Sequence, residues 1–298
     1  MITSTGDRIF SAVNYFLLMF IFVIVLYPMI YIIAVSVSDP ILVARGEIRL
    51  FPQGFNLDAY RNVFKNSDIW IGYRNTFFYT ICGTAVNLFV TITCAFALAR
   101  KKLAGKGWIM GFFVITMFFS GGIIPSYILI KNLGMLDTRW VMILPGAISI
   151  YHMIVTRTFF QSTIPEEMYE AAKIDGASDI GILCRIALPL SLPIIAVMGL
   201  FYGVSHWNQF FGALIYLNDR DLFPLQLVLR NILLMNQQLQ MDVSMMTSEE
   251  FDYVAKQAYM AESMKYALIF IASFPMLVAY PFVQRFFVQG VMIGSLKG

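Results

Sequence analysis

The side chains that could do acid–base or nucleophilic chemistry in this sequence are few and scattered. The two histidines, His152 and His206, have no aspartate or serine at a spacing that predicts a catalytic triad. The sequence has no phosphate-binding glycine loop with a lysine, no H-E-x-x-H motif and no C-x-x-C pair. The cysteines at 82, 94 and 184 are typical of small, buried apolar side chains. The sequence therefore predicts no catalytic residue and no metal site.

A second group of polar side chains favours ligand binding over catalysis. It combines aromatic rings with amides inside a long apolar stretch, and sugars bind where an aromatic face lies beside amide or hydroxyl partners. Neighbouring residues of a helix point in different directions, so these side chains cannot all line one pore. Anchoring at a membrane surface is the alternative interpretation, because Trp and Tyr are enriched there. The candidates for a substrate path are Tyr202, Trp207, Asn208, Gln209 and Phe211.

The segment 165–189 is polar and rich in small residues, although apolar stretches flank it. Pro165 and the two glutamates after it are typical of a helix start, because carboxylates suit the positive end of the helix dipole. Gly176 supplies a turn in which φ can be positive, and Ser178 with Asp179 can cap a second helix. The pattern predicts two short helices joined by a glycine turn. A Cβ at position 176 would cost helix geometry and could clash.

Each of these two helices is too short to be stable alone in water, so it must pack on its own bundle, on a partner or on both. The first helix is expected to share one face among Met168, Ala171, Ala172 and Asp175. The second is expected to end at Pro189 and to form its apolar face from Ile180, Leu183, Cys184 and Ala187. The helix pattern alone also fits an amphipathic loop that only seals the membrane surface.

The elements that must position these residues are membrane helices. The chain has 298 residues, of which 59% are hydrophobic and 13% charged, and its mean hydropathy is +0.72; soluble domains carry about 25% charged residues. A membrane helix needs about 20 mostly apolar residues. We expect one all-helical membrane domain over 1–298, with long loops at about 39–75 and 218–265 and the polar loop at about 161–188. The six predicted spans are 10–37, 76–99, 108–130, 140–160, 189–217 and 266–283.

Basic residues near the ends of the spans predict the orientation. The loop between the second and third spans carries Arg100, Lys101, Lys102 and Lys106 and no acidic residue, which places it in the cytoplasm. Both termini and the polar loop then lie in the cytoplasm, and the two long loops lie outside. With 21 Lys and Arg against 18 Asp and Glu, the charge gives no reason to expect nucleic acid as a partner.

The predicted spans have no Asp, Glu, Lys or Arg away from their ends. Carriers that are driven by protons or ions use such groups near the middle of the membrane. If this chain moves a solute uphill, another protein must therefore supply the energy.

The polar loop fits a longer pattern: E-A-A, three residues, Gly, nine residues and I-x-L-P. It resembles the EAA loop of permease subunits in binding-protein-dependent ABC importers. Further stretches resemble the maltose-type carbohydrate-uptake permeases, above all those that import oligosaccharides released from polysaccharides. These stretches are 74–80, 118–149, 157–178, 206–217, 224–233 and 290–298.

This resemblance implies a type I ABC importer permease fold with six transmembrane helices and cytoplasmic EAA coupling helices. It also implies a second, different permease, a cytoplasmic ATPase dimer that binds ATP and Mg, an extracellular solute-binding protein, a carbohydrate substrate and a place in the bacterial cell membrane. This chain would hold no cofactor. The residues implied at the contact with the ATPase are Glu170, Ala171, Ala172, Asp175, Gly176, Ala177, Ile186, Leu188 and Pro189.

Two alternatives remain open from the sequence. One is a permease of the same superfamily for a solute other than a sugar. The other is a membrane-embedded sensor or enzyme whose cytoplasmic loop binds a regulator, and the lack of catalytic groups in the spans argues against it.

Overall fold

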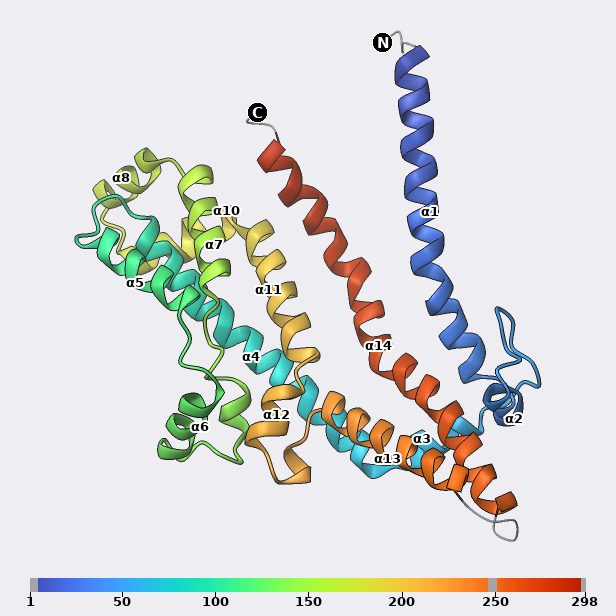
Figure 1. Cartoon of the computed structure of the whole chain (residues 1–298). Coiled ribbons are helices and arrows are strands. Elements are labelled where there is room, and N and C mark those ends of the chain that lie inside the picture. Colours follow the sequence, from blue (N-terminus) through green and yellow to red (C-terminus); the bar gives the residue numbers. More distant parts are fainter. Residues whose placement is uncertain (1–4, 246–250, 296–298) are drawn as a thin grey trace. The chain divides into compact units, whose positions relative to one another are not determined.

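The computed structural model describes residues 5–245 and 251–295, and every regular element within these ranges is a helix (Figure 1). By their internal contacts the residues form two compact units. Unit 1 comprises Met1–Ile69 and Leu229–Pro275, and unit 2 comprises Trp70–Val228 and Met276–Gly298. The expectation of one permease domain over the whole chain stays a prediction.

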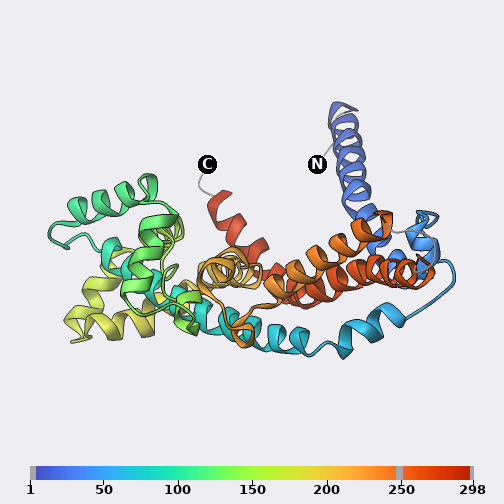
Figure 2. The same ribbon diagram turned by 60° about the horizontal axis from the view of Figure 1, so that its bottom comes forward.

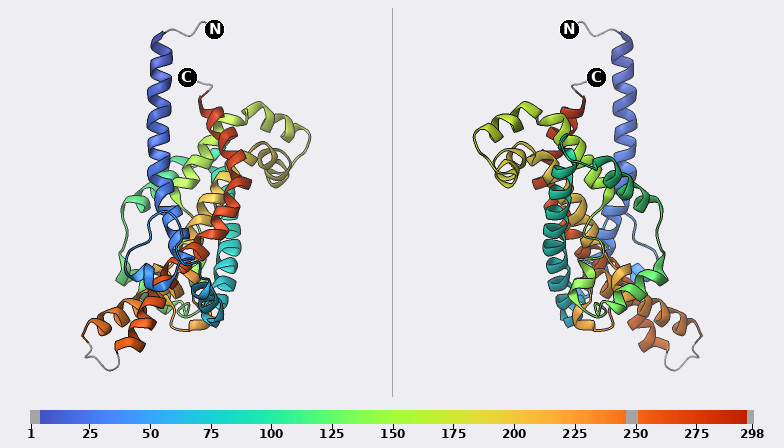
Figure 3. Two further views of the ribbon diagram at one scale, coloured as in Figure 1. Left: turned by 90° about the vertical axis from the view of Figure 1, so that its right-hand side faces the viewer. Right: turned by 90° about the vertical axis from the view of Figure 1, so that its left-hand side faces the viewer.

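Three of the predicted spans lie in long, continuous helices. These helices are α1 (Thr5–Ser36), α4 (Ser67–Ala99) and α14 (Phe251–Ser295), and in α14 the stretch long and apolar enough to cross a membrane is Gln257–Pro281. Figure 3 shows α1 as one unbroken helix, although Pro28 lies inside it. The first, second and sixth stretches are thereby confirmed as helices. Lys297, one of the basic residues near the C-terminus, lies outside the described residues.

The third predicted span, 108–130, is not one continuous helix. It is divided between α5 (Lys106–Phe118) and α6 (Ile123–Asn132), whose axes differ by 114°. Gly122 has φ +84° at the break, a conformation that glycine adopts without strain. Hydropathy alone predicts a straight span here, but α5 ends at Phe118 and two glycines lie in the irregular stretch before α6.

The fourth predicted span, 140–160, is also interrupted. A short 3-10 turn, η1 (Arg139–Met142), is followed by irregular chain that contains Pro145, and helix α7 covers only Ile150–Thr163. Fourteen helical residues extend about 21 Å, which is less than the roughly 30 Å of a bilayer core. The expectation of a single long helix over this stretch is wrong.

The fifth predicted span begins with a bend. The chain passes through α9 (Asp179–Ile182), the wider turn η2 (Leu183–Ala187) and α10 (Leu188–Leu190), and continues as α11 (Leu192–Trp207) at an angle of 84°. The prediction that Pro189 ends the second short helix is wrong, because the helix continues to Leu190 and breaks at Ser191. After a second break at 208–210, α12 covers Phe211–Tyr216.

Among the described residues, three continuous helices are long and apolar enough to span a membrane, and the number rises to five if each bent pair is one span. The remaining elements connect these helices. They are α2 (Pro40–Ala44), α3 (Asp58–Lys65), α8 (Glu166–Ile174), η3 (Arg220–Leu222) and α13 (Leu225–Met245).

Helix α4 organises unit 2. Its carboxyl-terminal half lies beside α7 and the short helices α8 and α9, which are yellow-green in Figure 2. Farther along the unit, the side chain of Asn75 donates hydrogen bonds to the backbone oxygens of Asp221 (2.7 Å) and Phe223 (3.1 Å). These contacts connect one helix to segments more than fifty residues away in sequence.

Candidate functional site

The polar loop folds as two helices and a glycine turn, as the sequence predicts. Helix α8 follows Pro165 and ends in a turn at Gly176, whose φ is +77°. The N–H of Gly176 donates to the oxygen of Lys173 (3.1 Å), and the N–H of Ala177 donates to the oxygen of Ala172 (2.9 Å). This pair of bonds is the Schellman motif, which satisfies carbonyls left open at a helix end. We term residues 165–190 the coupling segment, after the role that the sequence resemblance implies.

Glycine is needed at position 176 for its backbone conformation. A Cβ built there meets nothing within 4 Å, so the expected clash with surrounding atoms is absent. The left-handed conformation alone disfavours other residues. Beyond the turn, the hydroxyl of Ser178 accepts a hydrogen bond from the N–H of Gly181 (3.1 Å) and caps α9. The ion pair between Lys173 and Asp179 (3.4 Å) crosses the turn.

The coupling segment buries only part of each predicted face. Tyr169 and Ala172 are the buried residues of α8, whereas Met168, Ala171 and Asp175 are exposed. In the second part Ile182 and Ala187 are buried, and Ile180 and Cys184 are exposed. The sequence pattern predicted these faces but not which of their residues are buried, because burial depends on the tertiary partners α4 and α7.

Most residues expected at a partner contact are accessible. Glu170, Asp175 and Gly176 are exposed, as are Ala171 and Pro189. Three further residues are half-buried, namely Ala177, Ile186 and Leu188, and one is buried, Ala172. Two large apolar side chains that were not among the residues expected at the ATPase contact flank the turn: Ile174 is 87% exposed and Ile180 is 74% exposed.

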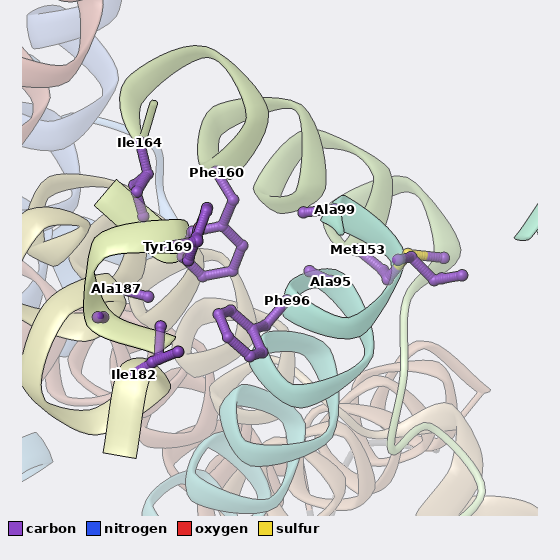
Figure 4. Close-up of a cluster of buried hydrophobic side chains, with 11 residues drawn as sticks. Ala95, Phe96, Ala99, Met153, Phe160, Ile164, Tyr169, Ile182 and Ala187 are labelled. Atoms are coloured by element: carbon purple, nitrogen blue, oxygen red, sulfur yellow. The ribbon is translucent and has the colours of Figure 1, made fainter. Parts of the chain in front are cut away.

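A buried cluster, termed the hinge cluster, holds the coupling segment against α4 and α7 (Figure 4). The Phe96 ring of α4 meets Phe160 of α7 and Tyr169 of α8 edge to face, with centroids 6.2 and 6.1 Å apart. Such aromatic pairs stabilise beyond the burial of their area. The cluster consists of Ala95, Phe96, Leu98, Ala99, Met153, Phe160, Ile164, Tyr169, Ala172, Ile182 and Ala187.

Polar contacts strengthen the same junction. The guanidinium carbon of Arg100 lies 3.8 Å from the centroid of the Tyr169 ring, a cation–π geometry. Burial raises the pKa of the Tyr169 phenol, so this ring is uncharged at neutral pH. Two α7 side chains, Arg157 and Gln161, donate to the last carbonyls of α4 at Leu98 (3.0 Å) and Ala99 (3.3 Å). Open carbonyls at a helix end attract such donors.

The ion pair between Lys102 and Glu170 (3.1 Å) also joins the α4–α5 loop to the coupling segment, but both side chains are largely exposed. Exposed pairs contribute little because water and salt screen them. We expect Lys102→Ala to change the free energy of unfolding by less than about 1 kcal/mol, as measured by denaturant unfolding in detergent. A larger loss would mean that this pair, rather than the buried contacts, holds the segment.

The candidates for a substrate path divide into two groups. Tyr202 and Trp207 are buried: the Tyr202 hydroxyl bonds the Thr91 hydroxyl (2.7 Å), and the Trp207 ring packs on Phe77 with centroids 5.3 Å apart. Their partners lie on α4, which sequence spacing could not indicate. Three candidates lie at the break after α11: Asn208 and Phe211 are exposed, and Gln209 is half-buried.

A buried chain of polar side chains ends at the same break. His206 Nε2 lies 2.6 Å from Asn87 Oδ1, and Asn87 Nδ2 donates to the oxygen of Gly146 (2.5 Å). On its other side, His206 Nδ1 faces Gln209 Oε1 at 3.3 Å. Sequence reasoning did not select Asn87, although an amide deep in an apolar span is a signal, because such groups need a buried partner.

Comparison with known proteins supplies the family. No protein-family model matches the sequence. Two relatives from Bacillus subtilis (strain 168), protein LplC and the polygalacturonan/rhamnogalacturonan transport system permease protein YtcP, are each 41% identical over 293 residues. The alignments cover 98% of this chain, 96% of LplC and 99% of YtcP.

A solved structure has the same fold. It is a chain of a bacterial ABC transporter involved in the import of the acidic polysaccharide alginate, with a TM-score of 0.84 and 32% sequence identity. The match covers 96% of this chain and 99% of that chain. Sequence identity and coverage this high show the family as well as the fold. This chain is therefore a membrane protein that belongs to the permease subunits of ABC transporters.

Proposed function

We propose that this chain is one of the two permeases of an ATP-driven importer of carbohydrates, and that it transmits ATP hydrolysis through the coupling segment. The structure of this segment carries the proposal. Its base is held by the buried hinge cluster, while its turn presents Ile174, Asp175 and Ile180 outward. A helical hairpin that is fixed at one end and apolar at the other suits docking on a soluble partner.

The partner that fits the turn is the cytoplasmic ATPase dimer, which binds ATP and Mg. Docking would bury the two exposed isoleucines beside the glycine turn, and burial of apolar area is favourable. Movement of the docked turn would pass through Tyr169 and Phe160 to α4 and α7, because close-packed clusters transmit displacement rather than absorb it. This chain has no role in binding the nucleotide.

In the membrane, the proposed permease has six spans with both termini in the cytoplasm. The three continuous helices and the two bent pairs supply five of these spans, and the interrupted stretch that ends in α7 is the sixth. The basic α4–α5 loop supports this orientation. The second permease is proposed to be a different chain, so that the two form the path as a heterodimer.

The proposed substrates are oligosaccharides derived from complex polysaccharides, delivered by an extracellular solute-binding protein. One relative is a transport permease for polygalacturonan and rhamnogalacturonan, and the structural match belongs to an importer of alginate. Asn208 and Gln209, together with the exposed Phe211 ring, offer amide and aromatic contacts of the kind that sugars use. The named relatives favour a transport function over a sensor or an enzyme. The experiment that follows distinguishes a sugar permease from a permease for another solute.

The test is co-purification followed by an ATPase assay. A tagged chain purified from its native host should carry a second permease and an ATP-binding subunit, both identified by mass spectrometry. Hydrolysis by the reconstituted complex, with its binding protein, is expected to rise with oligogalacturonides, rhamnogalacturonan fragments or alginate oligosaccharides. A chain that purifies alone would contradict the proposal. If only a peptide or glycerol phosphate stimulated hydrolysis, the substrate would be a solute other than a sugar.

A further inference from the structure

The buried chain of polar groups at the end of α11 holds together three segments that are distant in sequence. It reaches from the break at 208–210, through His206, to Asn87 on α4 and to the carbonyl of Gly146 in the irregular stretch before α7. Both Asn87 and His206 are buried. We infer that His206 is a positioning residue, which fixes the geometry of the 208–210 break and thereby of the proposed substrate path.

The hydrogen bonds of this buried network have one consistent order of donors and acceptors. Because the Asn87 amide nitrogen donates to Gly146, its oxygen Oδ1 faces His206, and His206 Nε2 must carry the hydrogen. A neutral ring then accepts at Nδ1. The Gln209 amide can be rotated by half a turn, which exchanges its oxygen and its nitrogen, two atoms of nearly equal size. Its N–H group then faces Nδ1 of His206. Each group in the chain has then a partner of the right kind.

The backbone of α4 fixes the histidine ring from a second side. A Cβ on Gly83 would collide with the His206 ring, so the helix approaches this ring as closely as glycine permits. Gly83 and Asn87 are four residues apart and lie on one face of α4. Steric contact and hydrogen bonding therefore select the same ring position, and the ring in turn orients Gln209.

The break that this network fixes contains two of the proposed path residues. Asn208 closes the end of α11 by donating from its amide to the oxygen of Val204 (3.0 Å), and Gln209 follows it directly. Without the imidazole, the oxygen of Asn87 would remain buried and unpaired, which is unfavourable. The break would then lose its hydrogen-bonded connection to α4 and sample other conformations.

The test measures the accessibility of the break by cysteine labelling. In the assembled complex the cysteines at 82, 94 and 184 of this chain are replaced by alanine. The reporter is a cysteine in place of Ala213, which is fully buried in α12 after the break. The reaction rate of this thiol with a small maleimide is expected to rise about tenfold in His206→Leu, because a lost buried hydrogen bond shifts a local equilibrium by that factor. His206→Gln, which keeps a donor near the position of Nε2, should stay within about twofold of the parent.

Two further variants ensure that the result does not depend on the His206→Leu substitution alone. Asn87→Ala removes the acceptor of His206 and should raise the rate as His206→Leu does. Ser205→Leu alters the exposed neighbour on the same helix and should leave it unchanged. Equal rates in all four variants would overturn the inference. If His206→Leu fails to assemble, the comparison of Asn87→Ala with His206→Gln decides the question in the same way.

The inference rests on the proposed function only for the identity of the solute. Labelling needs neither a solute nor ATP, so its failure leaves the transport proposal intact, and an unsuccessful sugar screen leaves the labelling result intact. With an oligosaccharide that stimulates the complex, His206→Leu is expected to raise the half-saturating concentration and to leave the maximal ATPase rate within about twofold of the parent. An unchanged half-saturating concentration would contradict the link to the path.

Discussion

Replacing Gly176 by valine is expected to reduce solute-stimulated ATP hydrolysis by about tenfold or more, while the chain still enters the complex. The φ of +77° at this position would place a β-branched side chain in the left-handed region, at a cost of roughly 1–2 kcal/mol or more. A cost of about 1.4 kcal/mol corresponds to a factor of ten in an equilibrium. Because an added Cβ meets no neighbouring atom within 4 Å, the loss should reflect the turn itself. The measurement compares stimulated ATPase activity at equal amounts of assembled complex.

The matched control for this variant is Gly105→Val. Gly105 lies in the α4–α5 loop with φ +72°, and a Cβ there also meets nothing within 4 Å. The backbone strain is therefore the same, but the residue lies outside the coupling segment. Gly105→Val is expected to retain most of the stimulation. Equal losses in the two variants would attribute the effect to general strain and would count against a coupling role for the turn at Gly176.

Replacing Phe160 by alanine is expected to lower the free energy of unfolding by about 3–5 kcal/mol, the range for removing a buried aromatic ring. Phe160 is fully buried between α4 and α8, edge to face with Phe96. Its removal would leave a cavity at the base of the coupling segment. Denaturant unfolding of the purified chain in detergent measures the change, and the weakened junction should also reduce stimulated ATPase activity.

Phe118→Ala is the control for the cavity. It removes the same ring from the end of α5, where the side chain is 75% exposed, and surface substitutions away from special contacts usually stay within about 0.5 kcal/mol. If Phe160→Ala and Phe118→Ala unfold at the same denaturant concentration, the hinge cluster is not the structural support described above.

Local signals in the sequence predicted the coupling segment well. Proline with two glutamates, a glycine and a serine each act through the backbone of their own turn, so the helix start, the turn and the second cap could be located without tertiary information. The burial of Tyr169 rather than Met168 could not be predicted in this way, because it depends on Phe96 and Arg100, which lie about seventy positions earlier in the chain.

The interruptions of the membrane helices were harder to predict. Hydropathy measures apolar content and carries no information on backbone breaks, so 108–130 and 140–160 read as spans although Gly122 and the segment around Pro145 interrupt them. The contacts of the candidate path residues could not be predicted from the sequence either. Tyr202 and Trp207 pack against α4. The Asn87 partner of His206 lies more than one hundred residues earlier in the sequence.

Site-specific photocrosslinking tests most directly whether the turn of the coupling segment contacts the ATPase. A photoreactive amino acid replaces Ile174, which is exposed beside the turn, or, as the control, Phe118. In the purified complex, illumination is expected to join position 174 to a partner that mass spectrometry identifies as the ATP-binding subunit, and position 118 should yield no such product. Crosslinks to the ATP-binding subunit from position 118 and none from position 174 would contradict the account.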